Sequence, residues 1–466
     1  MRTLEILLPI LLAVYLLWRS PRPRWVRLLP ALALLIMLIH FYREGYRWQM
    51  IPIYVLAFLL AIRALLAIKS PWDLRPRASV LTLLLLAVST ALPVALPVPS
   101  IPAPDGPYQV GTTSYELTDS SRKELYSGKD EARRFQIQVW YPSEPDPSAE
   151  QAHWMNHADV YSRAISEDIL GLPSFFLDHL ALVKLPAYKN SKVASSDTGY
   201  PIILFSHGWT GFNAQNTGQA LQLASHGYVV VAVQHTYGAV VTVFDDGTIA
   251  KYNPAALPRG APDADYDVAA DKLANQWAGD LSYALEFMTK QNSDSNSRFF
   301  QALDLSRVGV YGHSTGGGAA IQFCGRDARC KAVLGQDPFL RPISDEILRR
   351  GVTQTAFFMF SQRWHDDANS LNNRQFKPFF KNSKQALGAV YIEGTAHYDF
   401  SDLPLLSPLA PQLGLKGPIN GKRVTTIVDD YLLSFFDMTL KGIPSPLFDA
   451  QNQKYKEVRT LQQEDQ

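Results

Sequence analysis

The sequence predicts an α/β domain, with a mostly parallel central sheet flanked by helices, preceded by an N-terminal transmembrane helical region. Three observations support this fold class. Apolar residues crowd into the first hundred positions. After about residue 108, short apolar runs typical of buried strands alternate with helical patterns. A serine between two glycines, at position 314, stands directly between one such run and one such helix.

Four apolar runs fill residues 1–99 and predict a transmembrane region with about four helices. They are Leu4 to Trp18, Leu28 to Tyr42, Met50 to Ile68, and Val80 to Val98. A spanning helix needs about 20 apolar residues, a length that the last two runs reach and the first two do not. Helices of a soluble domain would show a polar face at every turn, and these runs do not. Because three more runs follow the first, a cleaved signal peptide fits poorly.

Basic residues in the connecting loops indicate the orientation of these helices. The first loop carries four arginines and the third carries three basic residues, whereas the second carries two beside an acid: Arg19, Arg22, Arg24 and Arg27; Lys69, Arg75 and Arg77; Arg43 and Arg47 beside Glu44. The positive-inside rule places the first and third loops in the cytoplasm. With four spans, both termini then lie outside. The sequence therefore predicts a multi-pass membrane protein whose C-terminal domain is extracytoplasmic, in the periplasm or at the exterior.

Composition divides the remaining chain into three parts. Residues 100–110 form a proline-rich linker, because successive prolines cannot continue a helix. Residues 111–450 form the α/β domain, and residues 451–466 a polar C-terminal tail. Two insertions interrupt the domain: an apolar, aromatic-containing helical stretch in residues 154–190, and a loop rich in Gly, Pro and Asp in residues 236–265. Each is either ordinary surface structure or a cover for a pocket or lipid.

The alternation within the domain predicts buried strands and covering helices. The expected strands are 135–141, 201–205, 228–233, 307–311, 332–334, 356–360 and 389–392. The expected helices are 216–225, 269–290, 317–323 and 424–440. Strands and helices that alternate at this spacing are typical of a parallel sheet covered on both faces.

The pentapeptide Gly312-His313-Ser314-Thr315-Gly316 is the strongest functional signal in the sequence. It matches G-x-S-x-G after the strand RVGVY and before a helix of small residues, which is the nucleophile elbow of the α/β-hydrolase fold. Gly312 and Gly316 would remove side chains that collide with the neighbouring strand and helix. We therefore expect Ser314 to be a nucleophile presented at a helix N-terminus, where backbone N–H groups stabilise an oxyanion.

An oxyanion hole needs a second donor, from the loop after an earlier strand. The strand at 201–205 is followed by Ser206-His207-Gly208-Trp209. We expect the backbone N–H groups of Trp209 and Thr315 to be the two donors. His207 is interpreted as a structural histidine that holds the loop.

The base and its orienting acid should follow the serine in the order Ser, Asp, His. His397, just after the strand AVYIE, is the favoured base, with His365 as the competitor. Asp337, directly after the strand ending at Leu334, is the favoured acid, because a carboxylate at a strand end can fix the imidazole tautomer. The alternatives to Asp337 are Asp366, Asp367 and, more weakly, Asp345.

The remaining composition restricts cofactors and partners. Lys and Arg total 44 against 43 for Asp and Glu, which gives no electrostatic case for a nucleic-acid partner. Cys324 and Cys330 have no histidine beside them at metal-ligand spacing, so no metal site is expected; in an oxidising compartment they could form a disulfide, and in a reducing one they would be free thiols. No organic cofactor is expected, and the sequence does not indicate an oligomeric state.

Several segments resemble the platelet-activating factor acetylhydrolase family, in its plasma and intracellular type II branch and its bacterial relatives. The segment ILFSHGWTGFNAQNTGQALQLASHGYVVVAVQH is similar to that family's FSHG loop, LASHG helix end and VEH-like strand end. GHSTGG resembles its GHSFGG elbow, IEGTAHYDFSD its G-x-x-H-x-x-F-x-D segment, and WYPSEP its early strand. The resemblance covers about residues 130 to 442 and leaves the membrane segments outside.

The resemblance implies a calcium-independent serine hydrolase with an α/β-hydrolase fold that cleaves short or oxidised acyl chains from phospholipids. Carried over by motif, Ser314 is the nucleophile, Asp337 the acid and His397 the base, with Trp209 and Thr315 as oxyanion donors. Thr315 stands where the family usually has phenylalanine, and Trp209 where it has leucine. Both act through backbone N–H groups, so these changes bear on substrate preference rather than on the oxyanion hole.

Three other functions remain open at this level. A general carboxylesterase or polyester hydrolase would act on non-lipid esters with the same residues. A binding module could keep the fold without catalysis, although the candidate triad argues against it. A transporter would need charged groups along a pathway, and the apolar runs contain scarcely any. The partners expected here are a lipid or small ester substrate and the bilayer.

Overall fold

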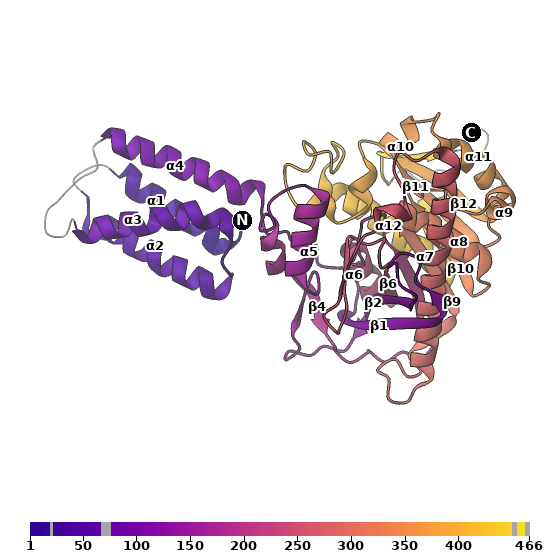
Figure 1. Cartoon of the computed structure of the whole chain (residues 1–466). Coiled ribbons are helices and arrows are strands. Elements are labelled where there is room, and N and C mark those ends of the chain that lie inside the picture. Colours follow the sequence, from indigo (N-terminus) through magenta and orange to yellow (C-terminus); the bar gives the residue numbers. More distant parts are fainter. Residues whose placement is uncertain (19–21, 67–75, 450–453, 462–466) are drawn as a thin grey trace.

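The computed structural model describes residues 1–18, 22–66, 76–449 and 454–461. A bundle of N-terminal helices stands to one side of a larger α/β domain, and the two parts are clearly separated along the long axis of the molecule (Figure 1). The expected loop residues Arg19, Lys69 and Arg75 lie outside the described residues, as does half of the expected C-terminal tail, residues 451–453 and 462–466.

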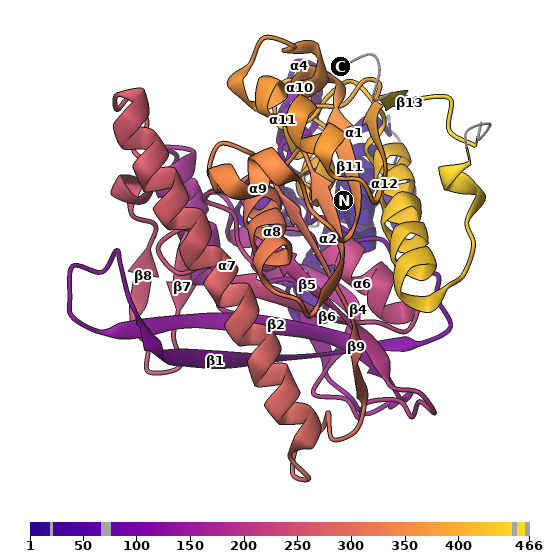
Figure 2. The same ribbon diagram turned by 90° about the vertical axis from the view of Figure 1, so that its right-hand side faces the viewer.

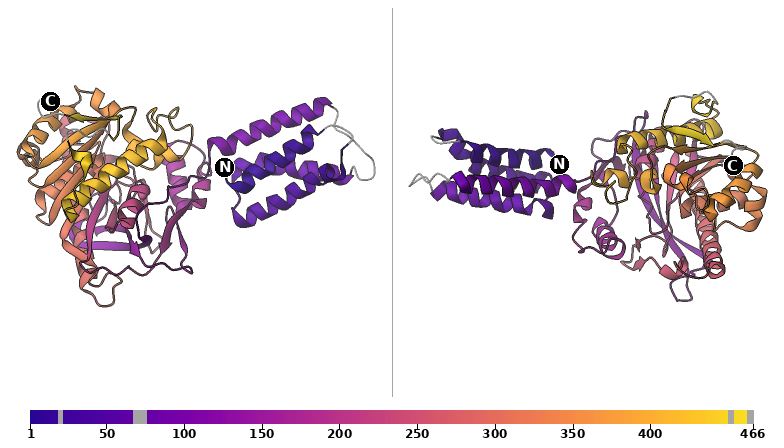
Figure 3. Two further views of the ribbon diagram at one scale, coloured as in Figure 1. Left: turned by 180° about the vertical axis from the view of Figure 1, so that it is seen from behind. Right: turned by 90° about the horizontal axis from the view of Figure 1, so that it is seen from above.

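The bundle consists of four helices that run up and down beside one another (Figures 1 and 3). They are α1 Thr3–Leu17, α2 Arg24–Arg43, α3 Ile51–Leu66 and α4 Pro76–Ala95, with the short 3-10 helix η1 Trp48–Met50 before α3. Among the described residues, three segments are long and apolar enough to cross a membrane: Arg24–Arg43, Trp48–Leu66 and Arg77–Ala95. The second apolar run is therefore longer than the sequence pattern indicated, whereas α1, with 15 residues, is shorter than a usual span.

The domain is built on an eleven-stranded sheet in the order β13-β12-β11-β10-β9-β5-β6-β2-β1-β4-β3. The strands from β12 to β6 are mutually parallel, β2 joins β6 antiparallel, and β13 joins β12 antiparallel. A separate hairpin pairs β7 with β8. The bounds are β1 Gln109–Lys123, β2 Ala132–Ser143, β3 Gln151–His153, β4 Lys184–Lys189, β5 Tyr200–Ser206, β6 Val229–Gln234, β7 Val241–Val243, β8 Ile249–Lys251, β9 Leu303–His313, β10 Cys330–Gln336, β11 Thr355–Ser361, β12 Ala386–Ile392 and β13 Val458–Leu461.

Helices cover both faces of this sheet, as the continuous apolar runs predict (Figure 2). Along β5, Ile203 and Phe205 pack into one core with α6 Thr217–Ser225 and α12 Gly421–Phe436. Ile202 and Leu204 point the other way, into a core with α7 Asp263–Ser293, α8 Thr315–Arg326, α9 Asp345–Arg350 and α11 Leu371–Asn382. Successive side chains of a strand point to opposite faces, so an unbroken apolar strand needs cover on both.

The structure differs from the sequence expectations mainly in the insertions and at the sheet edges. The expected helical stretch in 154–190 forms only the short helix α5 Ala158–Ala164, a π-helical turn, the 3-10 helix η3 Asp178–Leu182 and strand β4. Pro173 and Gly171 break the apolar pattern between them. The loop in 236–265 contains the β7–β8 hairpin, β1 begins within the expected linker, and β13 lies within the expected tail.

One end of the bundle is attached to the domain by polar and aromatic contacts. The Trp48 indole N–H donates to the Phe176 carbonyl over 3.1 Å, and its ring lies against Phe175 and Phe176. The Gln49 carboxamide is 2.8 Å from His179 Nδ1 in η3. The Ser407 hydroxyl donates to the carbonyl of Ala95 at the end of α4. The bundle therefore contacts both the 154–190 insertion and the loop that follows residue 397.

Candidate active site

Ser314 occupies a strained turn between β9 and α8. Its φ is 56°, a left-handed conformation that costs a non-glycine residue roughly 1–3 kcal/mol. Backbone hydrogen bonds hold the turn: Ser314 N–H donates to Gln336 over 3.0 Å, and the Ser314 carbonyl accepts from Phe339 over 2.9 Å. Ser314 is partly exposed, whereas His313 and Thr315 on either side are buried. The turn thus presents the serine of the pentapeptide to solvent and buries its neighbours.

The two glycines of the pentapeptide are required by close backbone packing. A Cβ on Gly312 would lie 2.3 Å from the Gly316 carbonyl oxygen. A Cβ on Gly316 would lie 2.1 Å from the carbonyl oxygen of Ser206 and 2.2 Å from that of His207. These contacts are far inside van der Waals distance, so only glycine allows α8 to start directly above β5. The two glycines therefore have the steric role that the sequence predicts for them.

His397 and Asp337 meet at the carboxyl ends of the parallel strands. His397 follows β12 at the start of a 3-10 turn, Asp337 follows β10, and Nδ1 of His397 is 3.0 Å from Oδ2 of Asp337. Asp337 is fully buried and also accepts hydrogen bonds from the backbone N–H and the hydroxyl of Ser361, each over 2.7 Å. This carboxylate can hold the imidazole with its proton on Nδ1, leaving Nε2 free to take another.

His313 connects the nucleophile turn to the His397 loop. Its Nε2–H donates to the His397 carbonyl over 2.9 Å, and its Nδ1 accepts from the Gln215 carboxamide over 3.0 Å. Burial holds the pKa of His313 well below its usual value, so the ring stays neutral and can accept at Nδ1. In the described part of the chain, no hydrogen bond joins the Ser314 hydroxyl to His397; such bonds are often loose before substrate binds.

The expected oxyanion donors lie on the two segments that flank Ser314. Thr315 is the first residue of α8, where backbone N–H groups have no partner within the helix. Trp209 follows Gly208, which lies close to the nucleophile: a Cβ added to Gly208 would be 3.4 Å from the Cβ of Ser314. The Trp209 ring packs edge-on against Tyr252 and is half-buried. The segment Ser206-His207-Gly208-Trp209, here called the HG loop, therefore reaches the turn that carries Ser314, as an oxyanion hole requires.

The competing candidates take no part in the hydrogen bond between His397 and Asp337. His365 stacks on Tyr391 with ring centroids 4.0 Å apart. Asp366 and Asp367 are exposed at the end of the short helix α10 Gln362–Asp366. Asp345 is exposed in the first turn of α9, 3.6 Å from Arg349. Of the histidines and acids considered from the sequence, the structure brings together His397 and Asp337.

Cys324 and Cys330 form a disulfide bond. Cys324 belongs to α8, which Ser314 precedes, and Cys330 begins β10, which leads to Asp337. The bond therefore joins the two elements that carry the candidate nucleophile and the candidate acid.

A second Ser–His–Asp arrangement lies beneath the HG loop. Ser206 Oγ is 2.9 Å from His235 Nε2, and His235 Nδ1 is 3.0 Å from Asp280 Oδ2. All three residues are completely buried, and the His235 ring stacks on Trp277 with centroids 4.2 Å apart. Because no substrate could reach Ser206, this arrangement is structural.

The buried arrangement of Ser206, His235 and Asp280, called the buried relay below, fixes the position of the HG loop. The backbone N–H of His235 donates to Nε2 of His207 over 3.1 Å, and His207 Nδ1 lies 2.7 Å from the Gly208 carbonyl. Asp280 also accepts from the guanidinium groups of Arg133 and Arg122. Burial lowers the pKa of His207 and His235, and the neighbouring arginines and His235 hold the pKa of Asp280 low despite its burial. His207 thus has the structural role expected from the sequence.

Two buried acids hold the loop that carries His397. Asp399 Oδ2 accepts from the backbone N–H groups of Ala396, over 2.8 Å, and Gly417, over 2.6 Å. Asp402 accepts from the N–H of Gly218 at the start of α6, over 3.1 Å. Burial raises the pKa of Asp399, and it raises that of Asp402 to about 7.

A cavity of about 270 Å³ opens beside His397. Its lining includes Arg363, Trp364 and Asp367. The ring centroids of Trp364 and His397 are 4.7 Å apart. A larger cavity, of about 560 Å³, shares no lining residue with it and lies against β1 and β2. The smaller cavity is therefore the space next to the candidate base.

Sequence and structure comparisons identify several proteins that are similar to this chain. Residues 96–443 match the family described as platelet-activating factor acetylhydrolase, isoform II. The chain is 27% identical to the platelet-activating factor acetylhydrolase of Cavia porcellus, over 73% of this chain and 78% of that protein. It is 24% identical to a probable 1-alkyl-2-acetylglycerophosphocholine esterase of Arthroderma benhamiae, over 78% and 95%. A ferulic acid esterase from Streptomyces cinnamoneus superposes with a TM-score of 0.62 at 25% identity, over 78% of this chain and 100% of that one.

The fold, the elbow and these relatives define the class of protein: an α/β-hydrolase-fold enzyme that hydrolyses ester bonds. Within that class, the chain belongs to the platelet-activating factor acetylhydrolase family, because the family match covers well over half of its length. The resemblance drawn from the FSHG and GHSTGG segments is thereby confirmed. The helical bundle, residues 1–95, lies outside the match.

Sequence reasoning missed several residues that support the site. Ser361, Gln215 and Asp280 were not singled out, although each contacts or orients a residue that was. Ser361 and Asp337 each stand directly at or after the end of a strand, and polar residues at such ends are the signal that could have found Ser361. Gln215 and Asp280 lie within a loop and a long helix, where no local pattern marks them.

We predict that Asp280→Asn destabilises the domain by about 2–3 kcal/mol, because the fully buried Arg133 loses one of its two charge partners and keeps only Glu124. Urea unfolding followed by tryptophan fluorescence measures the loss. Asp263→Asn, an exposed acid at the start of the same helix, is the matched control and should change the free energy of unfolding little. An Asp280→Asn protein as stable as the control would contradict the role assigned to the relay.

We predict that Asp402 makes the domain less stable as pH rises. The pKa of Asp402 in the folded protein, about 7, lies above its value of about 4 in the unfolded chain. Its contribution to the free energy of unfolding is therefore fully present below pH 4 and is lost as pH rises to about 7. The slope from one such group is about 1.4 kcal/mol per pH unit. Urea unfolding between pH 4 and 8 should show that the free energy of unfolding falls less steeply with pH in Asp402→Asn than in the wild type. Asp429, whose pKa is also raised by burial, is present in both proteins and affects them equally. Parallel pH profiles would show that Asp402 does not titrate in this window.

Proposed function

We propose that this protein is a membrane-anchored serine esterase that cleaves short or oxidised acyl esters of phospholipids or related lipids through an acyl-enzyme. The observation that carries the proposal is the hydrogen bond between His397 and buried Asp337, at the strand ends where Ser314 stands on its elbow. The names of the family and of its relatives support the lipid ester as substrate.

In the proposed mechanism, His397 Nε2 takes the proton of the Ser314 hydroxyl as its oxygen attacks the ester carbonyl. The backbone N–H groups of Trp209 and Thr315 stabilise the oxyanion of the tetrahedral intermediate. The imidazolium, oriented by Asp337, returns its proton to the departing alcohol and leaves the acyl group on Ser314. Water then attacks the acyl-enzyme with the same base, which releases the carboxylic acid and restores the hydroxyl.

The helical bundle supports anchoring in a bilayer with the catalytic domain outside the cytoplasm. Helices α2 and α4 begin at the end of the bundle away from the domain (Figure 1). The first turns of these helices carry Arg24, Arg27 and Arg77, and Arg22 precedes α2. Clusters of Arg and Lys favour the cytoplasmic side of a bilayer, and this preference supports an extracytoplasmic domain. The Cys324–Cys330 disulfide is consistent with an oxidising compartment such as the periplasm.

A general esterase acting on non-lipid esters is the second candidate, because the ferulic acid esterase from Streptomyces cinnamoneus shares this fold over its full length. Rates on short-acyl phospholipids, compared with rates on feruloyl and p-nitrophenyl esters, distinguish the two. A higher kcat/KM for the phospholipids supports the proposed function, and the reverse order supports the second candidate.

We predict that Ser314→Ala lowers the kcat for p-nitrophenyl butyrate by about 10⁴-fold or more, because the acyl-enzyme cannot form. Thermal unfolding should remain within a few degrees of the wild type, since the change removes one partly exposed hydroxyl. Ser206→Ala, which alters the buried serine instead, is the control that separates the two Ser–His–Asp arrangements: it should retain the acyl-enzyme step. Turnover retained by Ser314→Ala would refute the assignment.

We predict that Arg363→Gln raises the KM for a short-acyl phosphatidylcholine several-fold and leaves the KM for p-nitrophenyl butyrate nearly unchanged. Arg363 lines the cavity beside His397, where its guanidinium can reach a phosphate but a neutral ester offers it no charge partner. Arg374→Gln, on α11 and outside the cavity lining, is the matched control. An equal change in KM for both substrates would show that Arg363 does not contact a phosphate.

A further inference from the structure

The larger cavity, of about 560 Å³, has no part in the catalysis described above. It lies between the paired strands β1 and β2 and the segment 152–161, and it shares no lining residue with the cavity beside His397. Its volume is within the range of small-molecule sites, roughly 300–1,000 Å³. The chemistry of its lining therefore indicates what it could bind.

The floor of this cavity is the polar face of the antiparallel strands β1 and β2. In the register of β1 and β2, Ser114 is opposite Gln138 and Thr112 is opposite Trp140. The alternate residues Ile137 and Val139 point to the other face and belong to the apolar core there. Ser114 is exposed and Gln136 and Gln138 are half-buried, so a ligand in the hollow can reach these polar groups.

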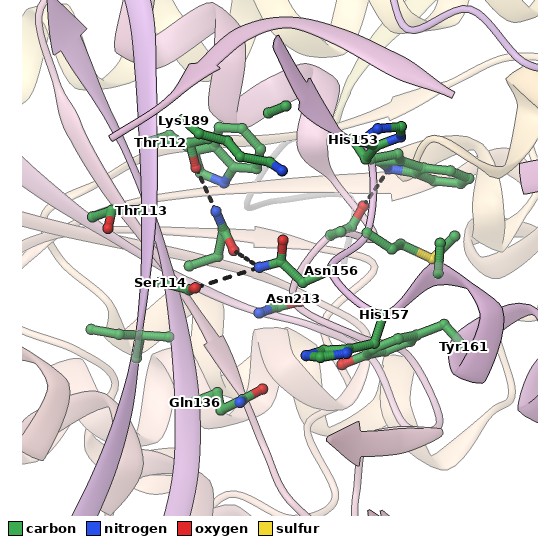
Figure 4. Close-up of a pocket in the computed structure, with 18 of the residues that line it drawn as sticks. Thr112, Thr113, Ser114, Gln136, His153, Asn156, His157, Tyr161, Lys189 and Asn213 are labelled. Atoms are coloured by element: carbon green, nitrogen blue, oxygen red, sulfur yellow. Dashed lines mark hydrogen bonds between the residues drawn. The ribbon is translucent and has the colours of Figure 1, made fainter. Parts of the chain in front are cut away.

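The cover contributes further polar and aromatic groups. The Asn156 carboxamide donates to Gln138 over 3.1 Å and reaches Ser114 at 3.5 Å (Figure 4). The indole N–H of Trp154 donates to the Ala214 carbonyl over 3.0 Å, which fixes one aromatic wall. Floor and cover are therefore joined by hydrogen bonds into one site.

The lining is rich in groups that both donate and accept hydrogen bonds. It includes five carboxamides, of Gln136, Gln138, Asn156, Asn190 and Asn213. Figure 4 shows Gln136, Asn156 and Asn213 around one hollow with Ser114.

The charged groups of the lining disfavour an anion. The one lysine of the lining, Lys189, is paired with Glu150 over 2.6 Å. Two carboxylates, of Asp159 and Asp245, also line the cavity and can accept hydrogen bonds from hydroxyl groups. Such a site matches a ligand that is rich in hydroxyl groups and carries no negative charge.

We propose that this cavity binds a neutral polyhydroxylated ligand, namely a sugar, either free or as the headgroup of a glycolipid. Each sugar hydroxyl can donate one hydrogen bond and accept two, and the carboxamides and hydroxyls of the lining offer both kinds of partner. A long acyl chain would form no hydrogen bond with these groups.

The site lies next to the elements that contact the helical bundle. Ala181, in its lining, is on η3, and its carbonyl is 3.1 Å from Nδ1 of His153. His179 of the same 3-10 helix contacts Gln49 of the bundle. If the bundle spans a bilayer as proposed above, a glycolipid headgroup at the membrane surface is within reach. Binding of a free sugar does not depend on that proposal.

The test uses the full chain carrying Ser314→Ala, so that no ester ligand is hydrolysed, in phosphatidylcholine nanodiscs free of glycoside detergent. Isothermal titration measures binding of cellobiose, maltose and lactose. A second series measures transfer to nanodiscs that contain digalactosyl diacylglycerol. Gln138→Leu/Asn156→Leu removes two carboxamides of the site, and Asn296→Leu, in the turn after α7, is the matched control.

We expect saturable binding of at least one of these sugars, weakened about tenfold or more by the double change and unaffected by Asn296→Leu. Binding of free disaccharides identifies a soluble sugar, and binding of the glycolipid alone identifies a membrane headgroup; either supports the proposal. Absence of saturable binding in both series, or equal affinity in the double variant, overturns it. In the chain with Ser314 intact, p-nitrophenyl butyrate turnover by the double variant should equal that of the wild type, which verifies its fold.

Discussion

The close approach of α8 to β5 is the constraint on which the rest of the site depends. Gly316 lies against the carbonyl groups of Ser206 and His207, where a single additional carbon would clash. This contact places the first turn of α8 beside the HG loop, so that the N–H groups expected to bind an oxyanion come from two segments more than a hundred residues apart in the sequence. It also forces Ser314 into its left-handed turn and thereby exposes its hydroxyl.

Rigidity around that contact comes from buried polar groups rather than from apolar packing alone. His313 ties the elbow to the His397 loop, and the relay of His235 and Asp280 supports the HG loop from below. Each group is hydrogen-bonded to a named partner, as burial of polar groups requires. The cost of such a network is that it tolerates little change, because the loss of one partner leaves another buried and unsatisfied.

The sequence predicted the parts of this protein that depend on short local patterns. The sheet was predictable because strands such as 201–205 are apolar on both faces, and the elbow because glycine is required at two fixed positions. The 154–190 insertion was mispredicted as helical, since its apolar spacing is broken by glycine and proline and its segments are shaped by contact with the sheet and with Trp48. Asp280 was not predictable, because its partner Arg133 is distant in sequence.

The most direct test of this account is a crystal structure of the catalytic centre after reaction with a fluorophosphonate. The account predicts a covalent bond from Ser314 to phosphorus, with the phosphonyl oxygen within hydrogen-bond distance of the Trp209 and Thr315 N–H groups and the His397 imidazole beside the serine oxygen. Labelling at another residue, or an imidazole that stays out of reach of the Ser314 oxygen in the adduct, would contradict it.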